Sequence, residues 1–94
     1  MNRIERTLSS LGGKKALITF VTAGDPSLEV TGELVLSMLS NGADIVEIGV
    51  PFSDPVAEGP VIQDASKRAL DGGVTLAGIF ETVKEIRKQT EAPL

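Results

Sequence analysis

The sequence predicts an α/β protein built on a parallel sheet, and three observations support this. Two short apolar segments rich in β-branched residues, 16–22 and 44–50, have the composition of buried strands. Longer segments separate and follow them, with apolar residues at helical spacing. Glycine or proline stands at the junctions between these segments. Strands that alternate with helices in this way form parallel sheets covered by helices.

The chain is expected to begin with a short amphipathic helix at 2–11, because Gly12-Gly13 follows its last apolar residue. In a barrel such a helix would close the bottom, and otherwise it would be a frayed arm. The first strand, 16–22, is apolar on both of its faces, which is typical of a strand covered on both sides.

A long helix is expected after the first strand, running to about Ser40. Asp25 is predicted to be its N-cap and Pro26 its first helical residue. Asn41-Gly42 is expected to end the helix, since glycine suits a left-handed cap. The predicted apolar stripe consists of Leu28, Leu34, Val35, Met38 and Leu39.

Two further helices are expected after the second strand. One starts at Pro60 and ends at Gly72-Gly73, and Thr75 caps another that covers 76–89. The predicted inner faces are Ile62, Ala65, Ala69 and Leu70 in the first, and Leu76, Ile79, Phe80, Val83 and Ile86 in the second. The last residues, 92–94, are interpreted as the approach to a third strand.

Composition limits the chemistry that the chain can perform. Its 94 residues make at most one small domain, and 41% hydrophobic residues argue against disorder. The absence of cysteine and histidine excludes a disulfide framework and Ser–His or Cys–His catalysis within the chain. Acid–base chemistry therefore falls to carboxylates. No apolar segment has the length of a membrane span and no signal peptide is evident, so we expect a cytoplasmic location.

Charge is distributed unevenly along the chain. Residues 16–66 contain eight acidic residues and no lysine or arginine. This acidic middle argues against nucleic-acid binding. It also means that a phosphate would have to bind at helix N-termini or outside this chain.

The second strand carries one carboxylate, Glu47, on a face that it shares with Ile45 and Gly49. The small Gly49 is expected to leave open space beside the carboxylate, and partial desolvation would suit Glu47 to proton transfer. Two alternatives are an edge strand with its polar face in water and a structural ion pair.

The loop after this strand holds two more acids, Asp54 and Glu58, and is stiffened by prolines that include Pro51 and Pro55. Glu58 can fold back over the end of the strand and face Glu47, and two such acids fit general acid–base work. Turn chemistry or helix capping is the alternative. We favour it for Asp54, whereas for Glu58 both interpretations stay open.

The segment from Glu47 to Pro55, Glu-Ile-Gly-Val-Pro-Phe-Ser-Asp-Pro, followed by Gly-Pro-Val-Ile-Gln at 59–63, strongly resembles the signature of the tryptophan synthase α subunit family. The earlier Phe-Val-Thr-Ala-Gly-Asp-Pro at 20–26 and Gly-Val-Thr at 73–75 also fit that family. The resemblance covers essentially the whole chain, which looks like the first third of a family member. It implies a (βα)8 TIM barrel, of which this chain is a βαβα fragment with an N-terminal helix and two parallel strands.

The resemblance also implies an activity, the retro-aldol cleavage of indole-3-glycerol phosphate to indole and glyceraldehyde 3-phosphate. Glu47 would be the general acid–base group, and Glu58, where the family usually has aspartate, would stabilise charge at the indole nitrogen. Phe20 would touch the substrate, although a plain core aromatic is the alternative from sequence. Asp54 and Pro55 would contact the β subunit of an α2β2 complex.

The same resemblance implies no metal and no organic cofactor for the α subunit. The family's phosphate-binding loops are missing from these 94 residues, so we expect the chain alone to lack lyase activity. Two strands with few helices also leave strand edges and an apolar strand face uncovered, so we expect the chain alone to self-associate or to be marginally stable. The alternatives are a non-catalytic barrel fragment that only assembles with partners, and another phosphate-substrate TIM-barrel enzyme.

Overall fold

The computed structural model describes residues 1–53 and 59–94. Its sheet consists of two parallel strands, β1 (Ile18–Thr22) and β2 (Ile45–Gly49), paired so that Phe20 lies opposite Glu47. The two strands predicted from the sequence are therefore confirmed, each slightly shorter than expected.

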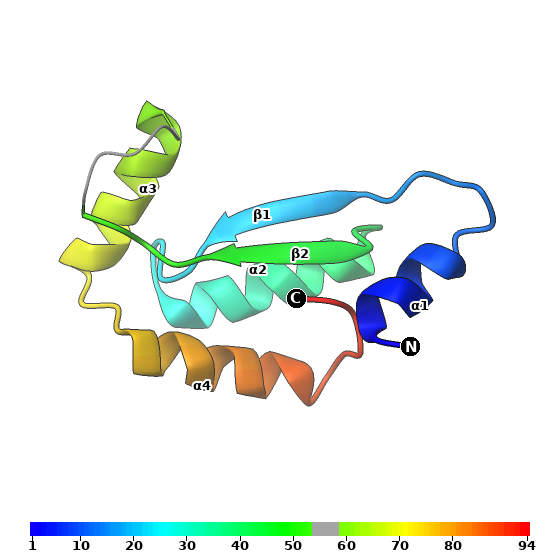
Figure 1. Ribbon diagram of the computed structural model, residues 1–94. Helices are drawn as coiled ribbons and strands as arrows, with labels where there is room; N and C mark the ends of the chain where they lie inside the picture. The colour runs from blue at the N-terminus through cyan, green and yellow to red at the C-terminus, as the bar shows by residue number, and fades with distance from the viewer. Residues whose placement is uncertain (54–58) are drawn as a thin grey trace.

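Helices surround this sheet unevenly (Figure 1). Two of them, α2 (Leu28–Ser40) and α4 (Leu76–Arg87), lie beneath one face. The helix α3 (Pro60–Asp71) stands at the carboxyl ends of the strands, and α1 (Arg3–Ser9) lies at the opposite end. No described segment covers the second face of the sheet, which is where Phe20 and Glu47 point.

The hydrophobic core lies between the sheet and the pair α2 and α4. Its centre is Val35, Ala43, Val46 and Ile86, all buried. Val46 and Ile48 alternate with Glu47 along β2, so the apolar face of this strand packs against the helices as the alternation predicts. Burial of this one face is what fixes the strand's orientation.

The start of α2 differs from the prediction. Ser27, and not Asp25, is the N-cap, because the Ser27 hydroxyl accepts a hydrogen bond from the Val30 amide at 3.2 Å. The Asp25 carboxylate instead binds Arg68 on α3. A serine two residues downstream supplies the same capping chemistry, so Asp25 is left available for a long-range contact.

The predicted inner faces of α3 and α4 are only partly correct. Ala65, Ala69, Ile79 and Ile86 are buried, as expected. Leu76 and Phe80, however, are 53% and 65% exposed, and Leu70 is 37% exposed. The reason for the exposure on α4 is that this helix packs mainly on α2. Its apolar stripe is wide enough to contact two neighbouring elements, but among the described residues only α2 covers it.

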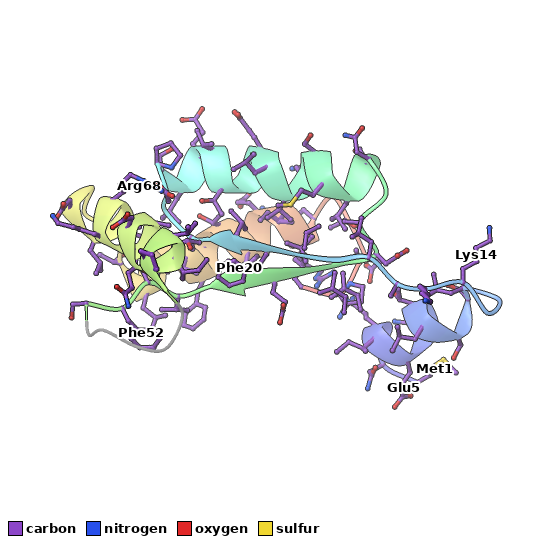
Figure 2. All side chains as sticks on the ribbon, turned by 90° about the horizontal axis from the view of Figure 1, so that it is seen from above. Met1, Glu5, Lys14, Phe20, Phe52 and Arg68 are labelled. Carbon is purple, nitrogen blue, oxygen red and sulfur yellow. The ribbon has the colours of Figure 1, made fainter. Side chains whose placement is uncertain are left out.

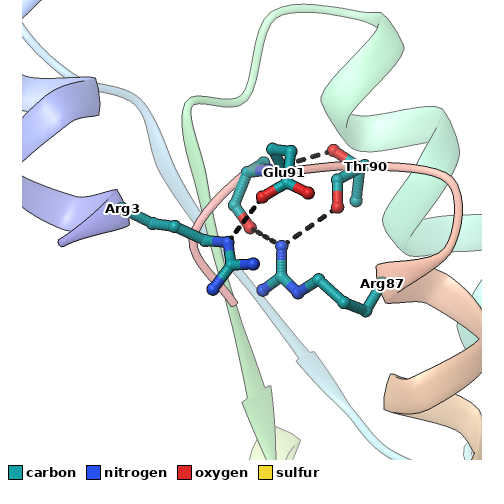
Figure 3. A network of polar contacts seen from close by, with 5 residues as sticks. Arg3, Arg87, Thr90 and Glu91 are labelled. Carbon is teal, nitrogen blue, oxygen red and sulfur yellow. Dashed lines mark hydrogen bonds and ion pairs between the residues drawn. The ribbon is translucent and has the colours of Figure 1, made fainter.

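A polar network fastens the two ends of the chain together (Figure 3). Arg3 of α1 binds the Glu91 carboxylate at 2.9 Å, and Arg87 donates to the carbonyl oxygens of Thr90 and Ala92 at 3.0 and 2.8 Å. The Arg3–Glu91 ion pair connects α1 to the end of the chain at the amino ends of the strands, but both side chains are exposed and α1 buries no residue. Both alternatives for this helix therefore stay open.

The end of the chain runs beside β2. The Pro93 carbonyl accepts a hydrogen bond from the Val46 amide at 3.2 Å, and Leu94 packs against the core. This is the position that a third parallel strand would take, although the strand itself stays a prediction. Among the described residues, no helix combines the length and the hydrophobicity needed to cross a membrane.

Candidate functional site

A cavity of about 120 Å³ opens where the two strands end. It is lined by Phe20 and Thr22 from β1, Gly49 from β2, Val50 and Phe52 just beyond it, and Ile62 and Ser66 from α3. In parallel α/β proteins, ligands bind at the carboxyl ends of the strands. The cavity is therefore the candidate site of this chain.

Aromatic rings form one side of this cavity. Phe20 is 46% exposed on the uncovered face of the sheet, and Phe52, 62% exposed, lies beyond the strand ends beside α3 (Figure 2). Phe20 is not buried in the described structure, and its predicted contact with the substrate stays a prediction. The sequence analysis did not identify Phe52 as a site residue. The only feature that could have indicated it is its position shortly after the second strand.

Gly49 is where the Phe20 ring comes closest to the backbone of β2. A Cβ atom placed on Gly49 would lie 2.7 Å from the Phe20 Cε2 atom, which is inside van der Waals contact. The expected open space beside Glu47 is therefore filled by the aromatic ring. Glycine at this position lets the ring approach the backbone of β2 closely.

Two buried hydroxyls also line the cavity. Thr22 and Ser66 are each 6% exposed and contribute their hydroxyl groups to the cavity lining. A hydroxyl can both donate and accept a hydrogen bond, so these two are suited to bind a polar atom of a ligand or a water. The sequence pattern does not identify either residue, because serine and threonine are common and nothing in their spacing marks them.

Glu47 lies on the same face as Phe20, two residues before Gly49, but its side chain is exposed. The expected partial desolvation is thus wrong for the described structure, because no described segment covers this face of the sheet. Glu47 also takes no part in the ion pairs found among residues 1–53 and 59–94, which argues against the structural ion pair. Its catalytic role stays a prediction.

The other predicted site residues, Asp54, Pro55 and Glu58, lie outside the described residues. Their predicted roles are therefore not tested. Within the described ranges, no group of three or more acidic, histidine or cysteine residues could hold a metal ion.

An ion pair joins α3, which lines the cavity, to the turn after β1. Arg68 of α3 donates two hydrogen bonds to the two carboxylate oxygens of Asp25, both at 2.9 Å, from its Nε and Nη2 atoms. These hydrogen bonds from Arg68 hold the pKa of Asp25 below its ordinary value, with burial opposing the shift and the charge of Arg68 adding to it.

Comparison with known sequences identifies relatives along the whole chain. A family model described as tryptophan synthase alpha chain matches residues 8–94. A tryptophan synthase alpha chain from Clostridium kluyveri is 56% identical over 96 aligned residues, which cover 100% of this chain and 36% of the relative. One from Petrotoga mobilis is 60% identical over 80 residues, covering 85% of this chain and 31% of the relative.

Solved structures of such proteins superpose closely on this fold. The tryptophan synthase subunit alpha from Legionella pneumophila str. Paris gives a TM-score of 0.93 at 46% identity, over 99% of this chain and 37% of that one. A subunit from Pyrococcus furiosus, described in an α2β2 complex, gives 0.79 at 41% identity over 83% of this chain and 31% of that one.

The fold and the strand-end cavity define a parallel α/β protein of the TIM-barrel class, with four helices and two strands in the described part of the chain. The chain spans 36% of the length of the Clostridium kluyveri relative. It belongs to the tryptophan synthase alpha chain family.

Proposed function

We propose that this chain forms the N-terminal part of an enzyme that cleaves indole-3-glycerol phosphate to indole and glyceraldehyde 3-phosphate. The observation that carries the proposal is the position of Glu47 in the middle of β2, on the uncovered sheet face and opposite Phe20, a residue that lines the cavity at the strand ends. Phenylalanine side chains suit a planar indole ring, and a nearby carboxylate suits proton transfer.

In the proposed reaction, Glu47 removes the proton from the glycerol hydroxyl next to the ring and delivers a proton to the ring carbon. The carbon–carbon bond between ring and side chain breaks, and its electron pair passes to the ring carbon as the hydroxyl becomes the aldehyde. Phe20 holds the ring, and Glu58 stabilises the charge that develops at the ring nitrogen.

The remaining assignments come with the family. We place the enzyme in the cytoplasm, and we propose that it assembles with a β subunit through Asp54 and Pro55. Coverage of Glu47 by further barrel strands would supply the desolvation that a proton-transfer group needs. The carboxylate would then be exposed only in the 94-residue chain.

The test uses a hybrid chain, in which residues 1–94 replace the aligned segment of the Clostridium kluyveri relative. Glu47→Gln keeps the size of the side chain but removes its ability to exchange protons. We expect it to lower kcat for indole release by about 100-fold or more, the usual contribution of a general acid–base group.

Glu33→Gln is the matched control, because Glu33 is an exposed acid on α2 that does not line the cavity. It should leave kcat unchanged. An active hybrid that keeps its kcat after Glu47→Gln would refute the role of Glu47.

The 94-residue chain alone is expected to release no indole. A separate chain that supplies the rest of the barrel should restore activity if the chain is part of an enzyme. A folded assembly of the two chains without activity would instead favour a non-catalytic assembly module.

A further inference from the structure

The helix α3 forms one side of the cavity, and the contacts between α3 and the rest of the fold determine where that side lies. Ile62 and Ser66, in the first two turns of α3, line the cavity. The N-cap residue of α3 is Gly59, which makes no side-chain capping hydrogen bond. The amino end of α3 is therefore not fixed by the usual capping hydrogen bond.

The second half of α3 packs against the turn between β1 and α2. A Cβ atom on Gly24, in that turn, would lie 3.4 Å from the Ala69 Cβ and 2.8 Å from the Val74 Cβ. The turn and the end of α3 are thus in close contact, which only glycine permits. This contact fixes the distance between the two segments but leaves the rotation of α3 about it open.

Asp25 and Arg68 supply the directional contact. Arg68 lies between α3 and the start of α2 in Figure 2, and its guanidinium binds both carboxylate oxygens of Asp25 at 2.9 Å. A two-point contact between planar groups restricts orientation more than a single hydrogen bond does. Ser66 and Arg68 belong to the same helix, so a rotation of α3 that breaks the Arg68 contact would also move Ser66 and the cavity side that it forms.

We propose that Asp25 and Arg68 are a positioning pair that orients α3 on the β1–α2 turn and so places Ile62 and Ser66 at the substrate. The inference rests on the proposed function, because the substrate of that reaction is what the cavity would bind. The pair touches no reacting atom. It acts on binding through α3, while Glu47 on β2 keeps its place.

The test compares Asp25→Asn, Arg68→Met and the double variant in the hybrid chain. Each single variant should raise KM for indole-3-glycerol phosphate about 10-fold with kcat changed less than about 3-fold, because a displacement of about 1 Å is enough for such losses. The double variant should be no worse than either single one, since both remove the same contact. Arg68→Lys keeps the positive charge but loses the two-point hydrogen bonding of the guanidinium, so its KM should lie between those of the wild-type hybrid and Arg68→Met.

Lys67→Gln is the matched control, because Lys67 forms an ion pair with Asp71 inside the same helix at 2.8 Å. It should change neither KM nor kcat. Amide hydrogen exchange of residues 60–71 gives a second readout that does not depend on activity, and exchange should rise in Asp25→Asn and Arg68→Met only.

Unchanged KM in an active hybrid, additive effects in the double variant, or unchanged exchange in α3 would each overturn the positioning pair. An inactive wild-type hybrid with faster α3 exchange in the two variants would instead count against the proposed function and support the pair.

Discussion

Gly49 and Phe20 illustrate how one missing side chain shapes the candidate site. The Phe20 ring occupies the space that a Cβ at position 49 would need. Because Phe20 is 46% exposed, its ring can move toward solvent when it is displaced. The glycine therefore controls where the aromatic side of the cavity lies more than it controls stability.

Gly49→Ala should accordingly raise KM several-fold in the hybrid chain. In the 94-residue chain, where the Phe20 ring can move toward solvent, the free energy of unfolding should fall by less than about 1 kcal/mol, the low end for an overpacked position. Steady-state kinetics and thermal unfolding check the two parts. Gly32→Ala is the control, since its Cβ would lie 3.9 Å from the nearest Thr82 atom, an ordinary contact. It should stabilise α2 by up to about 1 kcal/mol without changing KM. An unchanged KM in Gly49→Ala would contradict this account.

The Asp25 carboxyl predicts a pH dependence of stability. Arg68 lowers the pKa of Asp25 in the folded chain, so the ion pair stabilises the fold at pH values above the ordinary pKa and loses this effect as pH falls through the lower folded pKa. The hybrid chain should melt at a higher temperature than its Asp25→Asn variant at pH 6. The two melting temperatures should converge as the pH falls below the lowered folded pKa of Asp25, because the carboxylate is then protonated and the ion pair is lost. A difference that grows on acidification would have the wrong sign.

At the scale of single elements, α2 depends on Ser27 for its first turn. The Ser27 hydroxyl accepts a hydrogen bond from the Val30 amide, one of the backbone amides that have no partner within the helix at its start. Ser27→Ala should therefore destabilise the hybrid chain by about 1 kcal/mol. Thermal unfolding should show a melting temperature lower by about 2–4 °C for a chain of that size.

Ser37→Ala is the comparison within the same helix, because Ser37 is exposed and its side chain caps nothing. It should be neutral or slightly stabilising, since alanine is the better helix former. Equal losses from Ser27→Ala and Ser37→Ala would show that the capping bond contributes nothing.

At the scale of the whole molecule, the sheet has one covered and one uncovered face. Ile18 and Phe20 on the uncovered face are 52% and 46% exposed, and β1 has a free edge in the described structure. Contiguous exposed apolar surface and free strand edges favour association. The 94-residue chain by itself is therefore expected to self-associate.

Sedimentation velocity should show concentration-dependent association of this chain, and Ile18→Lys should reduce it by placing a charge on the uncovered face. Val61→Lys, at a position 76% exposed on α3, adds the same charge elsewhere and should have less effect. A monomer at all concentrations, or equal effects of the two lysines, would contradict the role of this face.

Much of this fold follows from local pattern. The alternation in 44–50 placed Val46 and Ile48 against the helices, and the helix ends at Gly42 and Gly72-Gly73 were readable from glycine. The start of α2 could not be predicted from the sequence, because Asp25 and Ser27 are both good N-cap residues. Only the position of Arg68 on another helix decides between them. The exposed Leu76 and Phe80 were missed for a similar reason, since an apolar stripe does not say how many neighbours it has.

The sequence by itself determined the family, the parallel βα order and the face on which Glu47 stands, because these depend on residue type and on the two-residue period of a strand. Only the tertiary structure decided that Thr22 and Ser66 meet Phe20 and Phe52 in one cavity, and that Asp25 binds Arg68, 43 residues away. Contacts between distant segments depend on how helices and strands pack in three dimensions, and the spacing of residues along a chain does not contain that information.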